Sequence, residues 1–433
     1  MREAVESWGR LTRAEHEIVR LHDRGEALPA IPPDARALPR GAGRSYGDAA
    51  LNAGGILWDM TGLDRFLAFD TEAGIVRAEA GMSFAALLTV AVAHGWFPPV
   101  TPGTSAVTLG GALAADVHGK NHHRVGTFGR HVRGFELLRS DGTRRECTPE
   151  KEADLFAATI GGLGLTGAVI WIELGLQRVD GPDMDVETVP FGALDEFFAL
   201  ARESDARHAY SVAWIDAMTP GAPGVFQRAN HAPGPGMPLR PRRPHSVPRL
   251  PVNTVRRPAL RAFNRLYRTR HDRPVRRRTH FETFFYPLDG LRHWNRLYGP
   301  AGFHQYQCVV PKAHGVDAMA AILGEVARSG ECCALGVLKI FGDLPSPGAM
   351  SFPMAGPSVA LDFPNRGAGT HALFERLDAI VRAAGGRLYP AKDARMSGAF
   401  FKESYPGWRT VARAADPRAA SDFWRRVAMD EGP

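Results

Sequence analysis

The most constraining feature of this sequence is a set of three glycine-rich segments within residues 39–167. They are PRGAGRSYGD (39–48), TPGTSAVTLGGALAADVHGKNHH (101–123) and GGLGLTG (161–167). Runs of small residues let backbone N–H groups surround a phosphate without interference from side chains. One such segment could equally form a tight hairpin. Three, each next to an expected strand, predict a large cofactor that carries phosphates.

The third segment matches the dinucleotide fingerprint G-x-G-x-x-G, but its surroundings are reversed. That fingerprint follows a strand and opens a helix, so that the pyrophosphate meets the helix N-terminus. Here ADLFAATIG (153–161) is expected to form a helix before the glycines, and AVIWIELGLQ (168–177) a strand after them. The order argues against a nicotinamide-binding Rossmann fold.

The chain is too long, at 433 residues, for one ordinary hydrophobic core. Its sequence pattern changes at Pro182. Residues 1–40 are expected to form a helical lead-in and then a proline-rich strap. Glycine-rich turns and short apolar runs follow to about residue 178. The clearest expected elements of this part are strands at 55–60, 74–81 and 167–177, and a helix at 83–95 with Ser83 as N-cap and Gly95 as its stop.

Longer helical and extended units after Pro182 predict a second region. Expected strands lie at 208–216, 304–311, 334–342 and 358–364, expected helices at 194–204 and 371–385, and the last forty residues are expected to be mostly helical. Both regions therefore mix helices with strands.

The positive charge is concentrated in one segment, at about residues 228–280. The chain has a formal net charge of +7 and a pI near 9.4, and outside this segment basic and acidic residues are mixed. The motifs and interleaved aromatics of nucleic-acid binders are absent from the sequence. The prolines of the segment at 228–280 predict a mobile loop. We expect its arginines to attract an anionic, lipid-linked phosphate; they include Arg240, Arg242, Arg243 and Arg276 to Arg278. A solvated linker is the alternative.

The four cysteines show no C-x-x-C spacing, and we expect them to be free core residues. Cys332 and Cys333 fall in an apolar stretch, GECCALGVLKIF, that is expected to be a buried strand. The N-terminus lacks the apolar run of a secretory signal, and no apolar run approaches the roughly 20 residues of a membrane span. We expect a cytoplasmic protein with peripheral membrane contact as an option.

Blocks of sequence in a fixed order resemble the vanillyl-alcohol-oxidase/p-cresol-methylhydroxylase flavoproteins. PRGAGRSYGD is similar to their pyrophosphate-binding loop. The blocks that resemble the decaprenylphosphoryl-β-D-ribose 2′-oxidase branch include HGKNHH (118–123), GTFGRHVRGFELLRSDG (126–142), YSVAWID (210–216), FFYPLD (284–289), LKIFG (338–342), LDFP (361–364) and RLYPAKD (387–393). The resemblance covers nearly the whole chain.

This resemblance implies an α+β fold, in which a two-part PCMH-type FAD-binding domain surrounds an inserted α+β substrate domain. The FAD-binding domain would span 1–178 and 389–433, and the substrate domain 179–388. Relatives with covalent flavin carry a histidine where Arg44 stands, so the resemblance implies noncovalent FAD. The implied cofactor-binding residues are Gly41, Gly43, Arg44, Ser45, Tyr46, Gly47, Gly103, Thr104, Thr108, Gly110, Gly111, Asn121, His122, Gly164 and Gly167.

Lys392 is the first candidate for catalysis. Hydride transfer from an alcohol to a flavin leaves negative charge on the reduced ring, and a buried cation stabilises that charge. The resemblance places this lysine against the flavin and the substrate hydroxyl. A solvated lysine at a strand end, with Asp393 as a helix cap, is the alternative.

His118 and Lys120 are the other catalytic candidates, because the resemblance places their block along the FAD. His118, His122 and His123 lie in a glycine-rich segment without an H-E-x-x-H pattern or a nearby thiolate. We therefore expect no metal site, and the alternative is a solvated surface cluster.

Five residues are candidates for contact with the substrate. Lys339 interrupts an apolar strand and shares a face with Val337 and Phe341, which suits a phosphate-binding lysine or, alternatively, an edge residue. The remaining candidates are Gln305 and Gln307, which share one strand face and suit sugar hydroxyls, and Tyr286 and Trp214, which would form a pocket wall or pack in the core.

The resemblance implies oxidation of a secondary hydroxyl of a furanose, phosphate-linked or glycosidic, to a keto-sugar as the first half of an epimerisation. A separate NAD(P)H-dependent ketoreductase would complete it. Ala360 stands where mycobacterial-type oxidases carry a pocket cysteine, which puts polyprenyl specificity in question. The alternatives are an oxygen-using alditol or aldonolactone oxidase and a basic surface-binding protein without catalysis.

Overall fold

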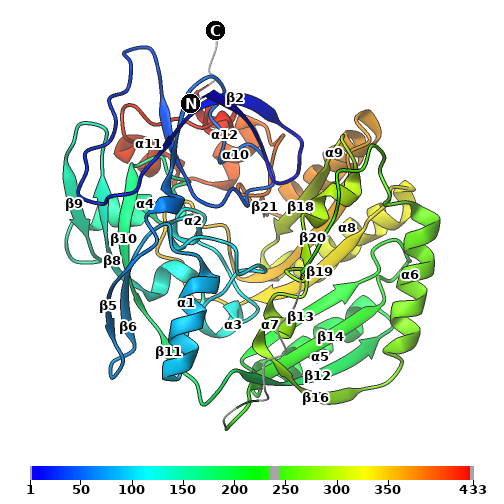
Figure 1. The fold of residues 1–433 in the computed structure, drawn as a ribbon. Coiled ribbons are helices and arrows are strands. Elements are labelled where there is room, and N and C mark those ends of the chain that lie inside the picture. Colours follow the sequence, from blue (N-terminus) through cyan, green and yellow to red (C-terminus); the bar gives the residue numbers. More distant parts are fainter. Residues whose placement is uncertain (1, 235, 237–243, 430–433) are drawn as a thin grey trace.

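The computed structural model describes residues 2–234, 236 and 244–429, and in them helices and β-sheets are mixed, as expected for an α+β fold (Figure 1). Three sheets carry most of the strands. Two are formed by residues 2–175 and the third by residues 183–388.

The first sheet has four strands and includes the N-terminus. Its order is β1 (Arg2–Glu6), β2 (Arg13–Arg20), β4 (Ile56–Asp59) and β3 (Ala37–Arg40). The expected helical lead-in is therefore wrong. Residues 13–20 alternate instead, with buried His16 between exposed Glu15 and Glu17, which is the period of a strand. The His16 ring also accepts a hydrogen bond from the backbone N–H of Asn52 at 3.0 Å.

The second sheet is antiparallel and has five strands. Its order is β5 (Phe66–Asp70), β6 (Ile75–Glu79), β10 (Ala168–Gly175), β8 (Val132–Leu138) and β9 (Arg144–Cys147). Helix α1 (Phe84–Ala91) begins after Ser83, whose hydroxyl accepts from the N–H of Ala86 at 3.2 Å, and its final 3₁₀ turn ends at Gly95 with φ 77°. Helix α4 (Ala153–Thr159) precedes β10, so the reversed order around the third glycine segment is confirmed.

The third sheet has eight strands, and every neighbouring pair is antiparallel. Its order is β16 (Val275–His280), β12 (Asp183–Phe191), β14 (Gly224–His231), β13 (Tyr210–Ile215), β19 (Leu335–Phe341), β20 (Gly356–Pro364), β18 (Phe303–Val309) and β21 (Arg387–Leu388).

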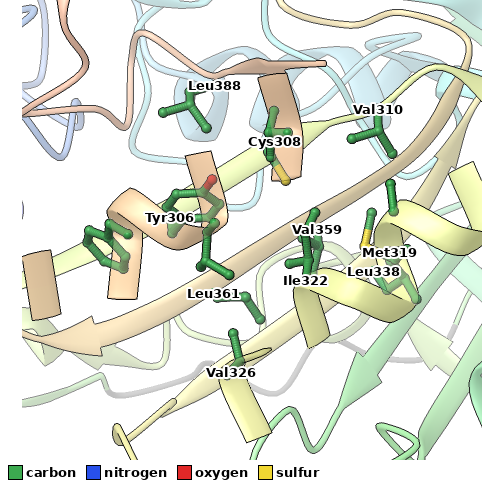
Figure 2. Packing of buried hydrophobic residues seen from close by; sticks show 14 of the residues in the cluster. Tyr306, Cys308, Val310, Met319, Ile322, Val326, Leu338, Val359, Leu361 and Leu388 are labelled. Atoms are coloured by element: carbon green, nitrogen blue, oxygen red, sulfur yellow. The ribbon is translucent and has the colours of Figure 1, made fainter. Parts of the chain in front are cut away.

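One face of this sheet is covered by α5 (Leu194–Asp205), α8 (Gly315–Ser329) and α9 (Ala368–Ala383). Figure 2 shows strand residues such as Cys308 and Val359 packed against Ile322 of α8. Because side chains alternate along a strand, the residues between these core positions point to the opposite face. That second face carries four of the five candidate substrate residues.

The C-terminal segment is mostly helical, as expected, with α10 (Gly398–Ser404), α11 (Trp408–Ala414) and α12 (Asp422–Trp424). It packs on the N-terminal part of the chain. Ala419 forms a parallel bridge with Ala37, and Arg426 makes an ion pair with Asp48 at 2.8 Å. The two ends of the chain therefore meet around the first glycine segment (Figure 1).

The expected mobile loop at 228–280 is wrong for most of that range. Arg240, Arg242 and Arg243 lie outside the described residues, but β14 runs to His231, and α6 (Arg257–Arg270) and β16 form regular structure. Pro258 is in the first turn of α6, where a missing N–H costs nothing. Two of the three arginines of β16 are held by carboxylates of β12, with Arg276 at 3.1 Å from Glu187 and Arg278 at 2.9 Å from Asp183.

All four cysteines are buried and free, as expected. Cys332 and Cys333 precede β19, which begins at Leu335, so the expected strand around them is wrong at its start. None of the helices in the described ranges is long and apolar enough to cross a membrane.

Candidate active site

The three glycine-rich segments meet in space. A Cβ on Gly41 would lie 2.2 Å from Thr108 Oγ1, and one on Gly164 would lie 3.4 Å from Pro39 Cγ. The backbone of the third segment also bonds to the second, because the N–H of Leu163 donates to Ala114 O at 2.8 Å. Their backbones therefore form one continuous wall, and a side chain at Gly41 would push two of the segments apart.

Arg40 lies inside this wall and was missed by the sequence reasoning. Its guanidinium fills the space beside Gly43, which has φ 62° and whose Cβ would lie 2.2 Å from Arg40 Nη2. Nε of Arg40 is buried and has no hydrogen-bond partner among the described residues. A buried cation with a free donor beside glycine backbone fits a diphosphate. Its position at the end of β3, directly before the glycines of the first segment, was the available signal.

Arg44 and Thr108 are held by local contacts. The guanidinium of Arg44 lies 4.5 Å from the ring centroid of Trp8, and burial lowers the pKa of Arg44. Thr108 caps α2 (Leu109–Ala114), because its hydroxyl accepts from the N–H of Gly111 at 3.1 Å. Gly103 borders open space, since a Cβ there would meet no atom within 4 Å.

Lys392 is brought to the first glycine segment by the C-terminal part of the chain. The N–H of Tyr46 donates to Ala391 O at 3.0 Å, and a Cβ on Gly47 would clash with Asp393 O at 1.6 Å. As a result, Lys392 Nζ lies 3.7 Å from the centroid of the Tyr46 ring. Because its ammonium group packs on this ring, the structure disfavours the alternative of a solvated lysine at a strand end.

Burial and charge set the state of Lys392. The pKa of Lys392 is lowered to about 7, mainly by burial; the charge of Lys339 adds to this lowering and Asp362 opposes it. Burial also raises the pKa of Asp362 to about 7, while a hydrogen bond from Gln305 Nε2 to its Oδ1 at 2.7 Å opposes that rise. Asp362 is a second residue that the sequence reasoning missed.

His118 lies against the eight-stranded sheet. The Gln307 amide donates to its Nε2 at 2.9 Å, and its ring packs 4.7 Å from that of Phe341 and 5.7 Å from that of Tyr389. Burial, helped by Lys339, lowers the pKa of His118 well below its usual value, so the imidazole is neutral. A neutral ring that accepts at Nε2 carries its proton on Nδ1, which is buried without a partner among the described residues.

Four of the five candidate substrate residues share the second face of the eight-stranded sheet, the one that α5, α8 and α9 do not cover. We call it the open face. Strand register places Gln305 opposite Asp362 and Gln307 opposite Ala360, while Lys339 lies opposite Ser358. The fourth candidate, Trp214, pairs with Val337 on the same face and packs 4.6 Å from the Tyr267 ring of α6. The period-two reading of these strands therefore agrees with the structure.

Tyr286 lies elsewhere, in the core. It is 1% exposed, and its hydroxyl shares a hydrogen bond with Thr101. Burial raises the pKa of Tyr286 far above its usual value. This side chain anchors the second glycine segment to α7 (Phe281–Phe285).

Lys120 makes a similar anchor. Its ammonium group donates to the carbonyl of Phe284 and lies 4.1 Å from that ring centroid. The pKa of Lys120 is lowered to about 7, mainly by burial and also by the charge of Lys339.

The HGKNHH histidines do not converge on a metal site. Asn121 donates to Pro99 O at 2.7 Å, and the buried His122 ring packs 4.5 Å from Phe341. Burial lowers the pKa of His122 to about 3. No group of three metal-binding side chains occurs in the described parts of the chain.

Lys339 links these groups electrostatically, and burial lowers its own pKa to about 8. Its charge lowers the pKa values of His118, Lys120, His122 and Lys392. Three of the six lysines of the chain thus gather in one place. Such a surplus of positive charge at partly buried positions favours binding of anions.

Comparisons with known proteins agree with this geometry. The family described as FAD binding domain matches residues 33–148, which include the first two glycine segments. The chain is 35% identical to decaprenylphosphoryl-beta-D-ribose oxidase of Mycolicibacterium smegmatis over 98% of this chain and 96% of that protein. It is also 27% identical to alditol oxidase of a Streptomyces species, over 74% of this chain and 73% of that protein.

Proposed function

This chain belongs to the FAD-dependent oxidoreductases related to decaprenylphosphoryl-beta-D-ribose oxidase, and we propose that it oxidises a secondary hydroxyl of a furanose sugar to a ketone. The observation that carries the proposal is the position of Lys392. This lysine lies between the glycine-rich wall, which suits FAD, and the open sheet face, which suits a sugar.

Bound FAD would supply the two-electron oxidation: the carbinol carbon of the sugar would lose its hydride to the flavin, and the hydroxyl proton would be released to solvent, which leaves a ketone. Lys392 would supply positive charge where the reaction develops negative charge, and a buried cation does this without solvent reorganisation. Asp362 would act as a positioning residue, because it keeps the pKa of Lys392 higher than burial alone would set it. His118, neutral and fixed by Gln307, would orient the reacting hydroxyl.

The proposed substrate contacts follow from the sheet face. Gln305 and Gln307 offer amide groups that suit sugar hydroxyls, and Lys339 would hold a phosphate. Trp214 would form part of the pocket wall, whereas Tyr286, which is buried in the core, would not contact the substrate. The substrate would be a phosphate-linked, lipid-carried sugar, because the related oxidase is named for such a compound.

The flavin would be bound without a covalent link through Arg44, because a guanidinium cannot form the bond that histidine forms in other flavoproteins. The proposed contacts to it come from the glycine-rich wall, including Gly103 and Thr104, together with Arg40. The product would be a keto-sugar. A separate NAD(P)H-dependent ketoreductase would reduce it to the epimer.

A second candidate is oxidation of a free alditol with oxygen. It is favoured by the similarity to alditol oxidase over 74% of the chain. The lysine surplus argues against it, because an uncharged alditol would leave that charge uncompensated.

Anaerobic reduction of the bound flavin tests the proposal. The purified holoprotein would be mixed with a polyprenyl-phosphoryl furanose, with the same polyprenyl phosphate lacking a sugar, or with a free alditol. We expect the oxidised-flavin absorbance to disappear with the first alone, and a keto-sugar to form in equal amount. Reduction by the free alditol at a comparable rate would favour the second candidate instead. Acid precipitation in the same preparation should release the flavin from the polypeptide.

A further inference from the structure

Helix α6 carries an apolar stripe on the side that faces solvent. Ala259, Ala262, Phe263 and Leu266 follow the i, i+3, i+4, i+7 spacing of one helix face, and all four are exposed. Phe263 is 53% exposed and Leu266 is 49% exposed. A stripe of this kind normally faces a core, so an exposed one indicates a surface that binds a partner.

The neighbouring side of α6 already has its partners. Leu260 packs against the main core, Asn264 donates to Asp216 Oδ1 at 2.8 Å, and Tyr267 packs on Trp214. The helix is therefore anchored through one face. The stripe lies beside that face, with the Phe263 ring stacked 6.0 Å from that of Tyr267, and still leaves Phe263 and Leu266 about half exposed. Figure 1 shows α6 on the outside of the molecule, beside the ends of strands of the eight-stranded sheet.

Exposed apolar side chains gather around this helix. The described residues include seven exposed large hydrophobic side chains, and four of them, Val252, Phe263, Leu266 and Val275, lie within residues 252–275. Scattered single residues of this kind are normal on a protein surface, but a cluster marks an interaction site.

The charge around the stripe identifies the kind of partner. Residues 244–280 contain eleven arginines and one acidic residue, Asp272; Arg268, Arg276 and Arg278 among them pair with carboxylates of other elements. Arg261 and Arg265 lie on the exposed side of α6 and make no ion pair in the described part of the chain. A nucleic acid would use the arginines but not the apolar stripe, whereas an anionic lipid surface uses both.

We propose that α6 docks the protein on the surface of an anionic lipid bilayer, with Phe263 and Leu266 inserted among the acyl chains and the flanking arginines at the phosphates. The same helix is tied to the candidate active site. Tyr267 packs on Trp214 of the open sheet face, and Val255, just before α6, packs in the cluster that contains Tyr46. Docking would therefore place the site beside the bilayer. The inference does not depend on which sugar is oxidised.

Vesicle co-sedimentation of the FAD-loaded protein tests this. The probes are phosphatidylcholine vesicles with and without phosphatidylglycerol, at low and high salt. We expect binding only with the anionic lipid, and weaker binding as salt rises. Arg261→Gln with Arg265→Gln should weaken binding about 30-fold, since each basic residue contributes ~1 kcal/mol at such a surface. Phe263→Ser with Leu266→Ser should weaken it roughly tenfold or more.

The matched control is Val316→Ser, which removes an exposed apolar side chain at the start of α8 and should bind as the wild type does. Bound flavin and light-scattering mass should be unchanged in every variant. No binding to anionic vesicles at low salt would overturn the inference. Binding of both double variants as tight as that of the wild type would also overturn it. If Phe263→Ser with Leu266→Ser changes the oligomeric mass but not vesicle binding, the stripe contacts a second copy of the chain instead.

Discussion

The two walls of the candidate active site are built by different means. The glycine-rich wall contributes mainly backbone, and its positions exclude side chains, as at Gly41 and Gly47. The open sheet face contributes side chains at alternate strand positions, as at Gln305, Gln307 and Lys339. Lys392 belongs to neither wall by sequence, and the C-terminal segment places it between them.

This difference suggests a division of labour. A backbone wall fits a cofactor of fixed shape, and any added atom disturbs it. A strand face can change its chemistry one residue at a time without disturbing the backbone. Ala360 on that face illustrates this, since it replaces the cysteine expected from the resemblance and leaves the strand intact. Changes to the two walls should therefore have separable effects.

The largest effect is expected at Lys392, between the walls. Lys392→Ala should retain FAD but slow flavin reduction roughly a hundredfold, because loss of a buried cation costs about 2–3 kcal/mol of transition-state stabilisation. Stopped-flow reduction under anaerobic conditions measures this. Wild-type reduction rates with normal FAD content would remove Lys392 from the mechanism.

A smaller effect is expected in the backbone wall. Gly41→Ala should weaken FAD binding about thirtyfold, because its Cβ would meet Thr108 Oγ1 at 2.2 Å and displace the second segment. Fluorescence titration of flavin into the stripped protein gives the dissociation constant. Gly175→Ala is the control, since the nearest atom to its Cβ would be His131 O at 3.7 Å. Equal losses in both variants would mean a general loss of folding.

On the sheet face, Gln307→Leu should lower kcat/KM about tenfold. The change removes an amide proposed to bind sugar hydroxyls and leaves His118 Nε2 without its donor, which costs about 1–2 kcal/mol. The FAD dissociation constant should not change. If FAD binding weakens while the kinetics of the bound flavin stay normal, Gln307 belongs to the cofactor wall instead.

The pH dependence gives the smallest and most specific effect. Lys392 is charged only below its folded pKa of about 7, so kcat/KM should be highest below that pH and fall as pH rises through it. Asp362→Asn removes the carboxylate that raises the pKa of Lys392, so the fall should move to lower pH. If kcat/KM of this variant falls at the same pH as that of the wild type, Asp362 does not influence the pKa of Lys392.

The sequence predicted the backbone wall better than the other parts of the site. Glycine positions reflect local restrictions on the backbone, so the three segments were visible without the fold. Alternation along strands also predicted the shared face of Gln305 and Gln307, and the structure confirms it. Lys392 was selected mainly through the resemblance, because its contact with Tyr46 joins residues far apart in sequence.

The errors have a common physical cause. Residues 13–20 and α6 are rich in charged residues, and their structure depends on partners elsewhere in the fold. β2 is fixed by pairing with β1 and β4, and the Arg-rich β16 by Glu187 and Asp183 of β12. Asp362 was missed for the same reason, since its link to Gln305 requires the register of two strands.

The division between the two walls is tested most directly by measuring FAD affinity and flavin reduction together in Gly103→Ala and Lys339→Met. A Cβ on Gly103 meets no protein atom within 4 Å, so alanine there should disturb only a bound cofactor. We expect Gly103→Ala to weaken FAD binding about tenfold and leave reduction of the bound flavin unchanged. Lys339→Met should leave FAD binding unchanged and slow flavin reduction about tenfold at limiting substrate. If both quantities change together in either variant, the two walls do not divide the work as proposed.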